Sequence, residues 1–349
     1  MLDKPNDTAS GCRITVRNGA ETTTFAMERN DLLLMGALEK GINWPHSCRV
    51  GTCGRCKTKL TCGKISPLVD FALSPLTNRD LKSGYVLACQ SKVRGDLEVE
   101  VGLLDHRVLL PRSIPGTITG WRMLSGEVID LTITLEQPLI YEAGQYAALA
   151  LAGSFVRRSF SFAGPPSGPE GTRQISFLIR HLPGGRFSGW LARQDRTGMR
   201  IWVEAPFGQM GLDDAPRDAL CIAGGTGIAP ILSIAAERLA RLPDNRITIV
   251  FGVRQARDLF VMDRLAELQA SGRVRVIPIL SHEPEGSGWS GARGWVTDAL
   301  TPDLGVDFAQ ASAFVCGSLP MVEAVEERLM ALGADLRRIH ADKFQPSGL

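Results

Sequence analysis

The segment His46-Ser47-Cys48-Arg49-Val50-Gly51-Thr52-Cys53-Gly54-Arg55-Cys56 places three cysteines within nine residues. Their thiolates can share one centre only if the chain wraps tightly around it, and Gly51 and Gly54 supply the backbone conformations that such wrapping needs. A fourth cysteine, Cys89, follows Cys56 after 32 intervening residues. The loop therefore predicts a metal centre that is completed by one ligand from a distant strand end.

The spacing of these cysteines indicates which metal centre to expect. C-x4-C-x2-C with a distant fourth cysteine is the pattern of a plant-type [2Fe–2S] cluster, in which four cysteines hold two irons. Structural zinc more often uses two C-x2-C pairs, of which this loop has one, and a disulfide framework is typical of exported proteins. The predicted iron ligands are Cys48, Cys53, Cys56 and Cys89. Cys62 is the alternative to Cys89, although we expect it in a hairpin turn at residues 62–64.

Composition and charge exclude several classes of protein. The 349 residues are 44% hydrophobic and 22% charged, which is ordinary for a globular chain of two or three domains. The net charge of +2 is too balanced for a protein that coats nucleic acid. No apolar stretch reaches the roughly 18 residues that span a bilayer, and residues 1–7 lack the apolar core of a secretory signal. We expect a cytoplasmic protein that binds neither nucleic acid nor membrane.

The first part of the chain, residues 1–102, reads as short strands and turns around one helix at 31–41. The expected strands cover 13–17, 22–25, 57–60, 85–89 and 96–101. Residues 103–115 contain two prolines and little periodicity, which is typical of a linker.

The rest of the chain divides into two further parts. Residues 116–213 repeat strand-like runs between glycines and prolines, which predicts an antiparallel barrel with one helix beginning near Ser188. Its expected strands cover 128–135, 146–151, 174–179 and 199–203. Residues 214–349 alternate strands with helices, which predicts a doubly wound parallel sheet. The expected strands cover 220–223, 247–251, 274–280 and 313–315, and the expected helices 229–242 and 321–332.

Two glycine-rich turns have the chemistry of phosphate sites. RRSFSF at 157–162 precedes GGRFSGWL at 184–191, which opens a helix. Glycines let the backbone approach an anion, and a helix N-terminus offers free N–H groups to a pyrophosphate. Arg158 adds a charge-assisted contact. GGTGIAP at 224–230 follows a strand directly. It departs from G-x-G-x-x-G but again predicts a tight turn and a helix that faces a diphosphate.

Together these motifs resemble two known families. The cysteine loop is similar to the C-R-x-G-x-C-G-x-C loop of plant-type ferredoxins over about residues 10–100. The later segments resemble the ferredoxin–NADP reductase superfamily, with its R-x-[YF]-[ST], G-x-x-S, G-G-T-G-x-[AT]-P and C-G-x-x-P motifs; the last corresponds to CGSLP at 316–320. The resemblance implies an α+β multidomain protein with an N-terminal β-grasp ferredoxin, an antiparallel β-barrel flavin domain, and a C-terminal α/β doubly wound parallel-sheet nucleotide domain.

The resemblance also implies residue roles. Arg158 would bind the FAD pyrophosphate, Phe160 would pack on the flavin in place of the more usual tyrosine, and Ser161 would lie by flavin N5. Cys316 would lie near the nicotinamide, and Asp342 and Phe344 near the flavin ring, with aspartate where relatives carry glutamate. The expected catalytic residues are Ser161, Cys316, Asp342 and Phe344. The expected cofactor-binding residues are Arg158, Ser159, Phe160, Ser161, Gly185, Arg186, Phe187, Ser188, Gly224, Gly225, Thr226, Gly227, Cys316 and Gly317.

The order of the three parts resembles the reductase components of bacterial multicomponent oxygenases, such as those of benzoate dioxygenase, phenol hydroxylase and methane monooxygenase. The resemblance implies electron transfer from NADH through FAD and a [2Fe–2S] cluster to a terminal oxygenase component or its ferredoxin, as in aromatic hydrocarbon catabolism. A flavin is needed because it accepts a hydride and releases single electrons. A reductase for deoxysugar biosynthesis and a redox-sensing binding protein without turnover are the alternatives.

Two charge patterns bear on the donor and the acceptor. Asp258 follows the second strand of the nucleotide part, where a carboxylate would repel the 2′-phosphate of NADPH, whereas Arg254 and Arg257 would attract it; we expect NADH. Residues 1–100 carry 14 Lys and Arg against 11 Asp and Glu. The sequence predicts a basic collar around the cluster loop that steers it to an acidic partner. The collar residues are Arg49, Arg55, Lys57 and Lys59.

Overall fold

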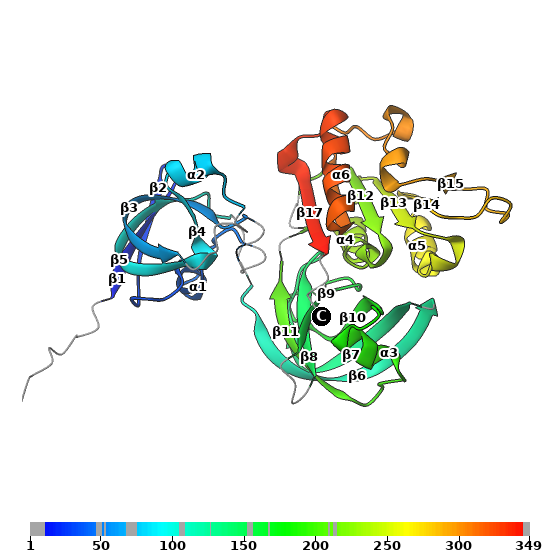
Figure 1. The fold of residues 1–349 in the computed structure, drawn as a ribbon, viewed down its shortest axis with the longest axis horizontal. Coiled ribbons are helices and arrows are strands. Elements are labelled where there is room, and N and C mark those ends of the chain that lie inside the picture. The colour runs from blue at the N-terminus through cyan, green and yellow to red at the C-terminus, as the bar shows by residue number, and fades with distance from the viewer. Residues whose placement is uncertain are drawn as a thin grey trace, which may run out of the picture. The chain divides into compact units, whose positions relative to one another are not determined.

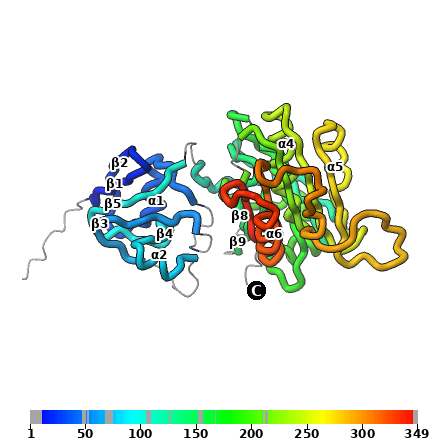
Figure 2. The backbone as a smooth tube through the Cα atoms, turned by 90° about the horizontal axis from the view of Figure 1, so that it is seen from above, coloured from blue at the N-terminus to red at the C-terminus, as the bar shows by residue number. Residues whose placement is uncertain are grey.

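The structure is a computed structural model. It describes residues 11–46, 51, 54–67, 75–104, 109–125, 127–151, 156–166, 168–208, 210–211 and 215–344. The chain divides into two compact units, Met1–Leu110 and Pro111–Leu349, whose elements are labelled in Figure 1 and whose backbone is traced in Figure 2. Among the described residues, no helix is long and apolar enough to cross a membrane.

The first unit is a five-stranded mixed sheet with a helix packed on it. The strands are β1 (Cys12–Asn18), β2 (Glu21–Met27), β3 (Lys57–Pro67), β4 (Tyr85–Leu87) and β5 (Ser91–Glu100), in the order β2-β1-β5-β3-β4. Strands β1 and β5 are parallel and the other neighbours antiparallel. The helices are α1 (Leu33–Glu39) and α2 (Asn78–Lys82). The apolar side chains of α1, among them Leu34 and Leu38, are buried in the core of this sheet.

The second unit begins with an antiparallel barrel. Its strands are β6 (Arg112–Ser125), β7 (Val128–Leu139), β8 (Tyr146–Leu151), β9 (Arg157–Ser161), β10 (Thr172–Arg180) and β11 (Arg200–Phe207), in the order β10-β7-β6-β11-β8-β9, with α3 at Arg186–Ala192. A bridge between Phe162 and Phe177 connects the end of β9 to β10. The two outer strands of the order therefore meet, and the sheet closes around a core that contains both phenylalanines.

The nucleotide part has a six-stranded sheet whose neighbouring strands are all parallel. The strands are β12 (Ala219–Gly224), β13 (Ile247–Val253), β14 (Val274–Leu280), β15 (Ala292–Arg293), β16 (Ser312–Ser318) and β17 (Ile339–Phe344), in the order β15-β14-β13-β12-β16-β17. The helices are α4 (Ile228–Arg241), α5 (Met262–Gln269) and α6 (Leu319–Ala331). One hydrophobic cluster packs α4 and α5 against the sheet and a second packs α6, so helices cover both faces (Figure 1).

Short 3-10 turns connect several of these elements. They cover Ala88–Gln90, Gly225–Gly227, Ala256–Asp258, Val296–Ala299, Pro302–Leu304 and Leu336–Arg338. Gly225–Gly227 follows β12 directly, and Ala256–Asp258 follows β13 after two residues. The ends of these two strands are therefore shaped by tight turns at the edge of the sheet where dinucleotides bind in such folds.

The predicted multidomain α+β architecture is confirmed, with several differences in detail. Strand β6 begins at Arg112, inside the segment expected to be a linker. Strands β15 and β17 and helices α2 and α5 were not expected. The hairpin turn expected at 62–64 is wrong: β3 continues through Cys62 to Pro67 and pairs with β5, with irregular register on both sides of Cys62. The domain boundaries themselves stay a prediction.

Candidate functional site

Two of the predicted iron ligands lie side by side. Cys56 and Cys89 are buried, and their Sγ atoms are 3.2 Å apart. The backbone N–H of Ala88 donates to the carbonyl of Cys56 over 3.1 Å, which joins the start of β3 to the turn after β4. Cys48 and Cys53 lie outside the described residues. The structure thus brings the last cysteine of the loop together with the distant fourth cysteine of the predicted ligand set.

Buried hydrogen bonds position the cysteine loop. The indole of Trp44 donates to the hydroxyl of Thr58 over 3.1 Å, and this hydroxyl donates to the carbonyl of Cys56, also over 3.1 Å. Gly51 and Gly54 have φ values of +88° and +72°, the left-handed region that the sequence predicted. Because side chains disfavour this region, the backbone favours glycine at both positions.

The geometry disfavours Cys62 as a replacement for Cys89. Cys62 is exposed on β3, six residues beyond Cys56. At about 3.3 Å per residue, an extended strand separates the two positions by roughly 20 Å. A cluster whose ligands include Cys56 is therefore out of reach of Cys62.

The predicted flavin segments meet in the barrel. Arg158 and Phe160 point to the same side of β9, and the Phe160 ring packs on Phe187 of α3 with centroids 5.3 Å apart. Arg158 is half-buried, and its Nη1 donates to the carbonyl of Arg157 over 2.8 Å. Ser159 is exposed and Ser161 is buried. The structure therefore joins the two motifs through their aromatic side chains.

The glycine turn before α3 is closely packed and is held by a hydrogen bond to Ser188. The helix begins at Arg186, two residues before the expected start. The hydroxyl of Ser188 accepts from the backbone N–H of Leu182 over 3.1 Å, and a Cβ on Gly185 would collide with this hydroxyl. Arg186 is exposed, whereas Phe187 and Ser188 are buried. The backbone of the turn, rather than the Ser188 side chain, is the part that remains accessible to a phosphate.

The second glycine turn lies at the point where the strand order reverses. Strand β12 has β13 on one side and β16 on the other, and Ala223 at its end is the register partner of Cys316. Open α/β sheets bind their ligands in this crevice, at the carboxyl ends of the strands. Gly225 has a φ of +54°, and a Cβ there would meet none of the described residues within 4 Å. The turn therefore presents open backbone at the expected diphosphate position.

Strand β17 brings together three of the four predicted catalytic residues, Cys316, Asp342 and Phe344. Across β16 and β17, Cys316 pairs with Asp342 and Ser318 with Phe344. Cys316 is fully buried, and burial, followed by the negative charge of Asp342, raises the pKa of its thiol well above the usual range. The thiol is therefore neutral at physiological pH. Phe344 packs against the hydrophobic cluster that contains Cys316.

The barrel and the nucleotide part share a core. Ala163 and Leu178 of the barrel belong to the same cluster as Ala223 and Cys316. The backbone N–H of Ala143 donates to Glu237 on α4 over 3.2 Å, and Arg264 on α5 donates to the carbonyl of Ala163. These contacts fix Ser161, two residues before Ala163, relative to the nucleotide sheet.

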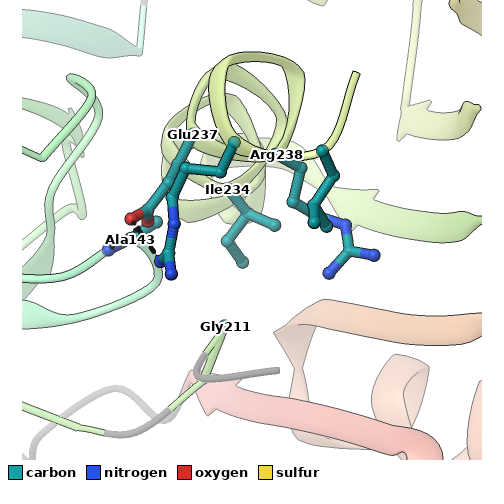
Figure 3. A pocket seen from close by; sticks show the side chains of 7 residues that line it. Ala143, Gly211, Ile234, Glu237 and Arg238 are labelled. Atoms are coloured by element: carbon teal, nitrogen blue, oxygen red, sulfur yellow. Dashed lines mark hydrogen bonds and ion pairs between the residues drawn. The ribbon is translucent and has the colours of Figure 1, made fainter. Parts of the chain in front are cut away.

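The cavity beside the Glu237 contact is not a cofactor site. It lies between α4 and the barrel, as Figure 3 shows. Its lining residues are Ala143, Gly211, Ile234, Glu237, Arg238, Arg241 and Leu242. Its volume of about 20 Å³ holds one water molecule at most. Burial, and to a lesser extent the charge of Glu237, raises the pKa of Tyr141 above its usual value. We interpret this region as an interdomain contact.

Asp258, the expected specificity residue, and the residues of the basic collar make contacts that the sequence did not predict. Asp258 accepts from the backbone N–H of Gln255 over 3.1 Å and so caps its own turn. Lys57 pairs with Asp80 over 3.0 Å, and Lys59 pairs with Glu100 over 3.2 Å. Arg55 is exposed, and Arg49 lies outside the described residues. Two of the four collar charges are therefore balanced by neighbouring carboxylates.

The sequence analysis missed residues that contact parts of the chain far away in the sequence. Glu237 and Arg264 lie on helices whose polar faces resemble any solvated surface, and the barrel atoms that they contact are backbone atoms of Ala143 and Ala163. Met321 directly follows the CGSLP segment and received no role in the sequence analysis, although a Cβ on Gly224 or on Gly317 would overlap its sulfur. Met321 therefore lies in the crevice between β12 and β16, a position that only the parallel pairing reveals.

Comparison with known proteins supports this arrangement. A model of the 2Fe-2S iron-sulfur cluster binding domain matches residues 16–94, and a model of the oxidoreductase NAD-binding domain matches residues 221–327. The electron transfer component of the xylene/toluene monooxygenase of Pseudomonas putida is 36% identical and covers 92% of this chain and 90% of its own. The reductase component of the phenol 2-monooxygenase of Pseudomonas sp. (strain CF600) is 30% identical and covers 91% and 90%.

A solved structure matches over nearly the full length. The crystal structure of an Amycolatopsis cytochrome P450 reductase has a TM-score of 0.78 and 30% sequence identity, covering 95% of this chain and 99% of that chain. The matches confirm an oxidoreductase whose cofactors are a [2Fe–2S] cluster, FAD and a nicotinamide nucleotide. The chain belongs to the family of reductase components, also called electron transfer components, of multicomponent oxygenases.

Proposed function

We propose that this chain passes electrons from NADH, by way of FAD and its own [2Fe–2S] cluster, to the oxygenase component of an aromatic-hydroxylating system or to a ferredoxin of that system. The observation that carries the proposal is the buried pair of Cys56 and Cys89, in a chain whose second unit joins a flavin-type barrel and a parallel nucleotide sheet through one core. The family assignment favours this interpretation over a deoxysugar reductase.

The residues present fit the three groups. Convergent thiols at Cys56 and Cys89 are the donor set that iron–sulfur clusters use, and Cys48 and Cys53 complete it in the sequence. Among the described residues, the space beside the backbone of Gly225 is open, and a side chain at this position would fill it. A turn with a positive φ can direct successive backbone N–H groups toward an anion, and this suits a diphosphate. Bound FAD supplies the exchange between a two-electron hydride and single electrons.

The protein's own part in the reaction is to bind and orient. Arg158 and the backbone around Gly185 would neutralise and hold the flavin pyrophosphate, and Phe160 would cover the flavin. The Gly224–Gly227 turn would hold the diphosphate of NADH beside Cys316. Because the Cys316 thiol stays protonated, it adds no negative charge where a hydride must approach. Asp342 and Phe344 border the same place through their pairing with β16.

The partner and the compartment follow from the same chemistry. Exposed Arg55 remains as an unbalanced charge of the cluster loop among the described residues, since Lys57 and Lys59 are paired. We infer that it contributes to docking on an acidic partner surface. Cluster thiolates and NADH are both suited to a reducing compartment, and on this ground we infer a cytoplasmic location.

Two kinds of acceptor test the proposal in the holoprotein. NADH-dependent reduction of ferricyanide needs the flavin alone, whereas reduction of cytochrome c and of an oxygenase needs the cluster. Cys89→Ala is expected to retain ferricyanide reduction and to lose the reduction of cytochrome c and of the oxygenase. Negligible turnover of the wild type with all three acceptors would instead support the redox-sensing alternative.

Docking is tested by charge reversal. Arg55→Glu combined with Arg49→Glu should slow reduction of the oxygenase most strongly at low salt, because screening shortens the reach of the charges to about 8 Å at 0.15 M. Ferricyanide reduction should not change. Equal rates of oxygenase reduction by variant and wild type at low ionic strength would exclude the docking role.

A further inference from the structure

The end of β13 is where this fold decides between NADH and NADPH. In dinucleotide-binding sheets the diphosphate lies at the glycine turn after the first strand, and an acidic residue after the second strand bonds the 2′-hydroxyl of the adenosine ribose. Here the second strand is β13, and the residues that follow it are Arg254 to Asp258. Asp258 is committed to capping the Gln255 N–H, so its carboxylate faces its own turn.

A second carboxylate reaches the same turn from the neighbouring strand. Glu283 lies three residues beyond β14, and its Oε2 accepts from the backbone N–H of Ala256 over 2.7 Å. Two backbone bonds extend the pairing of β13 and β14 to this point, from Ser281 N–H to Val253 over 3.0 Å and from His282 N–H to Arg254 over 2.8 Å. Glu283 is thus held in place by the strand pairing itself.

The surroundings keep Glu283 ionised. Its hydrogen bond from Ala256, then that from the Ser287 hydroxyl, and the positive charges of Arg293 and Arg257 hold its pKa below the usual range. Arg293 also donates to the carbonyl of Glu283 over 2.6 Å, which fixes the loop. The carboxylate in return offsets the two guanidinium charges that would otherwise favour a phosphate.

On these contacts, and on the proposed use of NADH by this site, we infer that Glu283 is the residue that selects against the 2′-phosphate of NADPH. It acts in two ways. Its charge repels a phosphate that approaches the end of β13, and its bond to Ala256 occupies a backbone N–H that would otherwise bind an anion. With Asp258 on Gln255 and Glu283 on Ala256, the N–H groups of two consecutive residues at the start of the turn are both occupied by carboxylates.

Two variants separate the effect of the Glu283 charge from the effect of its hydrogen bond to the Ala256 N–H. Glu283→Gln keeps an acceptor for Ala256 but removes the charge, whereas Glu283→Ala removes both. Loss of one negative charge beside a doubly charged phosphate at a solvent-exposed site is expected to strengthen its binding about tenfold. Glu283→Ala should gain at least as much. The matched control is Glu285→Gln, which removes an exposed charge two residues away.

Binding of 2′,5′-ADP, with 5′-AMP as the reference ligand, is measured by calorimetry on the holoprotein at low and high salt. The inference predicts tighter binding of 2′,5′-ADP to both Glu283 variants, unchanged binding of 5′-AMP, and a gain for Glu283→Gln that shrinks at high salt. The kcat/KM for NADPH should rise by the same factor, with that for NADH unchanged.

The outcomes distinguish this inference from the proposed function. Unchanged 2′,5′-ADP affinity in both Glu283 variants, or an equal gain in Glu285→Gln, would overturn the role of Glu283. A wild-type kcat/KM that favours NADPH would overturn the NADH preference in the proposed function, whatever the variants do. Loss of 5′-AMP binding together with 2′,5′-ADP binding would show that Glu283 only supports the loop and would likewise refute the selection.

Discussion

The Gly227→Ala variant tests how the nicotinamide site is built. Gly227 ends the turn between β12 and α4 and packs directly on the backbone of β16. A Cβ at this position would lie 2.7 Å from the carbonyl carbon of Cys316 and 3.1 Å from the nitrogen of Gly317, and would overlap the Cys316 oxygen. Carbon atoms in contact stay about 3.5–4.0 Å apart. The turn and β16 must therefore separate by about 1 Å.

The expected losses of stability and of kcat/KM follow from this separation of the turn from β16. Overpacking of a tight core costs about 1–3 kcal/mol, and we expect the upper half of that range because the contact is with backbone that cannot rotate away. A misplacement of about 1 Å at a reacting centre lowers rates by about 10²-fold. Gly227→Ala should therefore lower kcat/KM for NADH about 10²-fold, measured as ferricyanide reduction, and should lower the Tm.

Two other glycines serve as comparisons. Gly224→Ala should cost less, because the atom that it overlaps is the sulfur of Met321, a flexible side chain. Gly95→Ala, where a Cβ would meet none of the described residues within 4 Å, should leave the activity unchanged. Wild-type Tm and kcat/KM in Gly227→Ala would refute the close packing of the turn on β16.

Two further predictions concern cysteines. Cys89→Ala should abolish the visible absorbance of the cluster while FAD stays bound, whereas Cys62→Ala should retain it; the reverse pattern would show that the ligand assignment is wrong. Burial raises the pKa of the Cys221 thiol to about 12, against a partial opposing effect of the Arg238 charge. Since the unfolded thiol ionises near 8.5, this group's contribution to stability is complete below that pH and is lost as the pH rises to about 12. Cys221→Ala should flatten this alkaline loss in urea titrations, and an unchanged slope would contradict it.

Local patterns were enough to predict most of the elements and the motifs. The apolar runs at 220–223 and 247–251 became β12 and β13 because buried parallel strands are continuously hydrophobic. The cysteine spacing anticipated the proximity of Cys56 and Cys89 because a cluster imposes convergence on the chain. Such features are encoded within a few residues, and a single sequence shows them directly.

Features that depend on distant pairing could not be predicted. Strand β17 reads IHADKF, with no apolar run, and becomes a strand only by pairing with β16. The pairing of Lys57 with Asp80 and the capping role of Asp258 depend on rotamers and turn geometry that composition does not reveal. Glu283 was missed for the same reason, since its partner Ala256 lies on a different strand end.

Strand β17 lies at the edge of the sheet, and its register against β16 depends on the length of the connection between α6 and β17. Side chains alternate between the two faces of a strand, so a shift of one residue exchanges the faces. One residue inserted between Ala331 and Ile339 would turn Asp342 away from Cys316 and would put a neighbour in its place. Leu332 and Ala334 of this connection pack against the core of the sheet, so during sequence divergence its exposed positions can change more easily than its length.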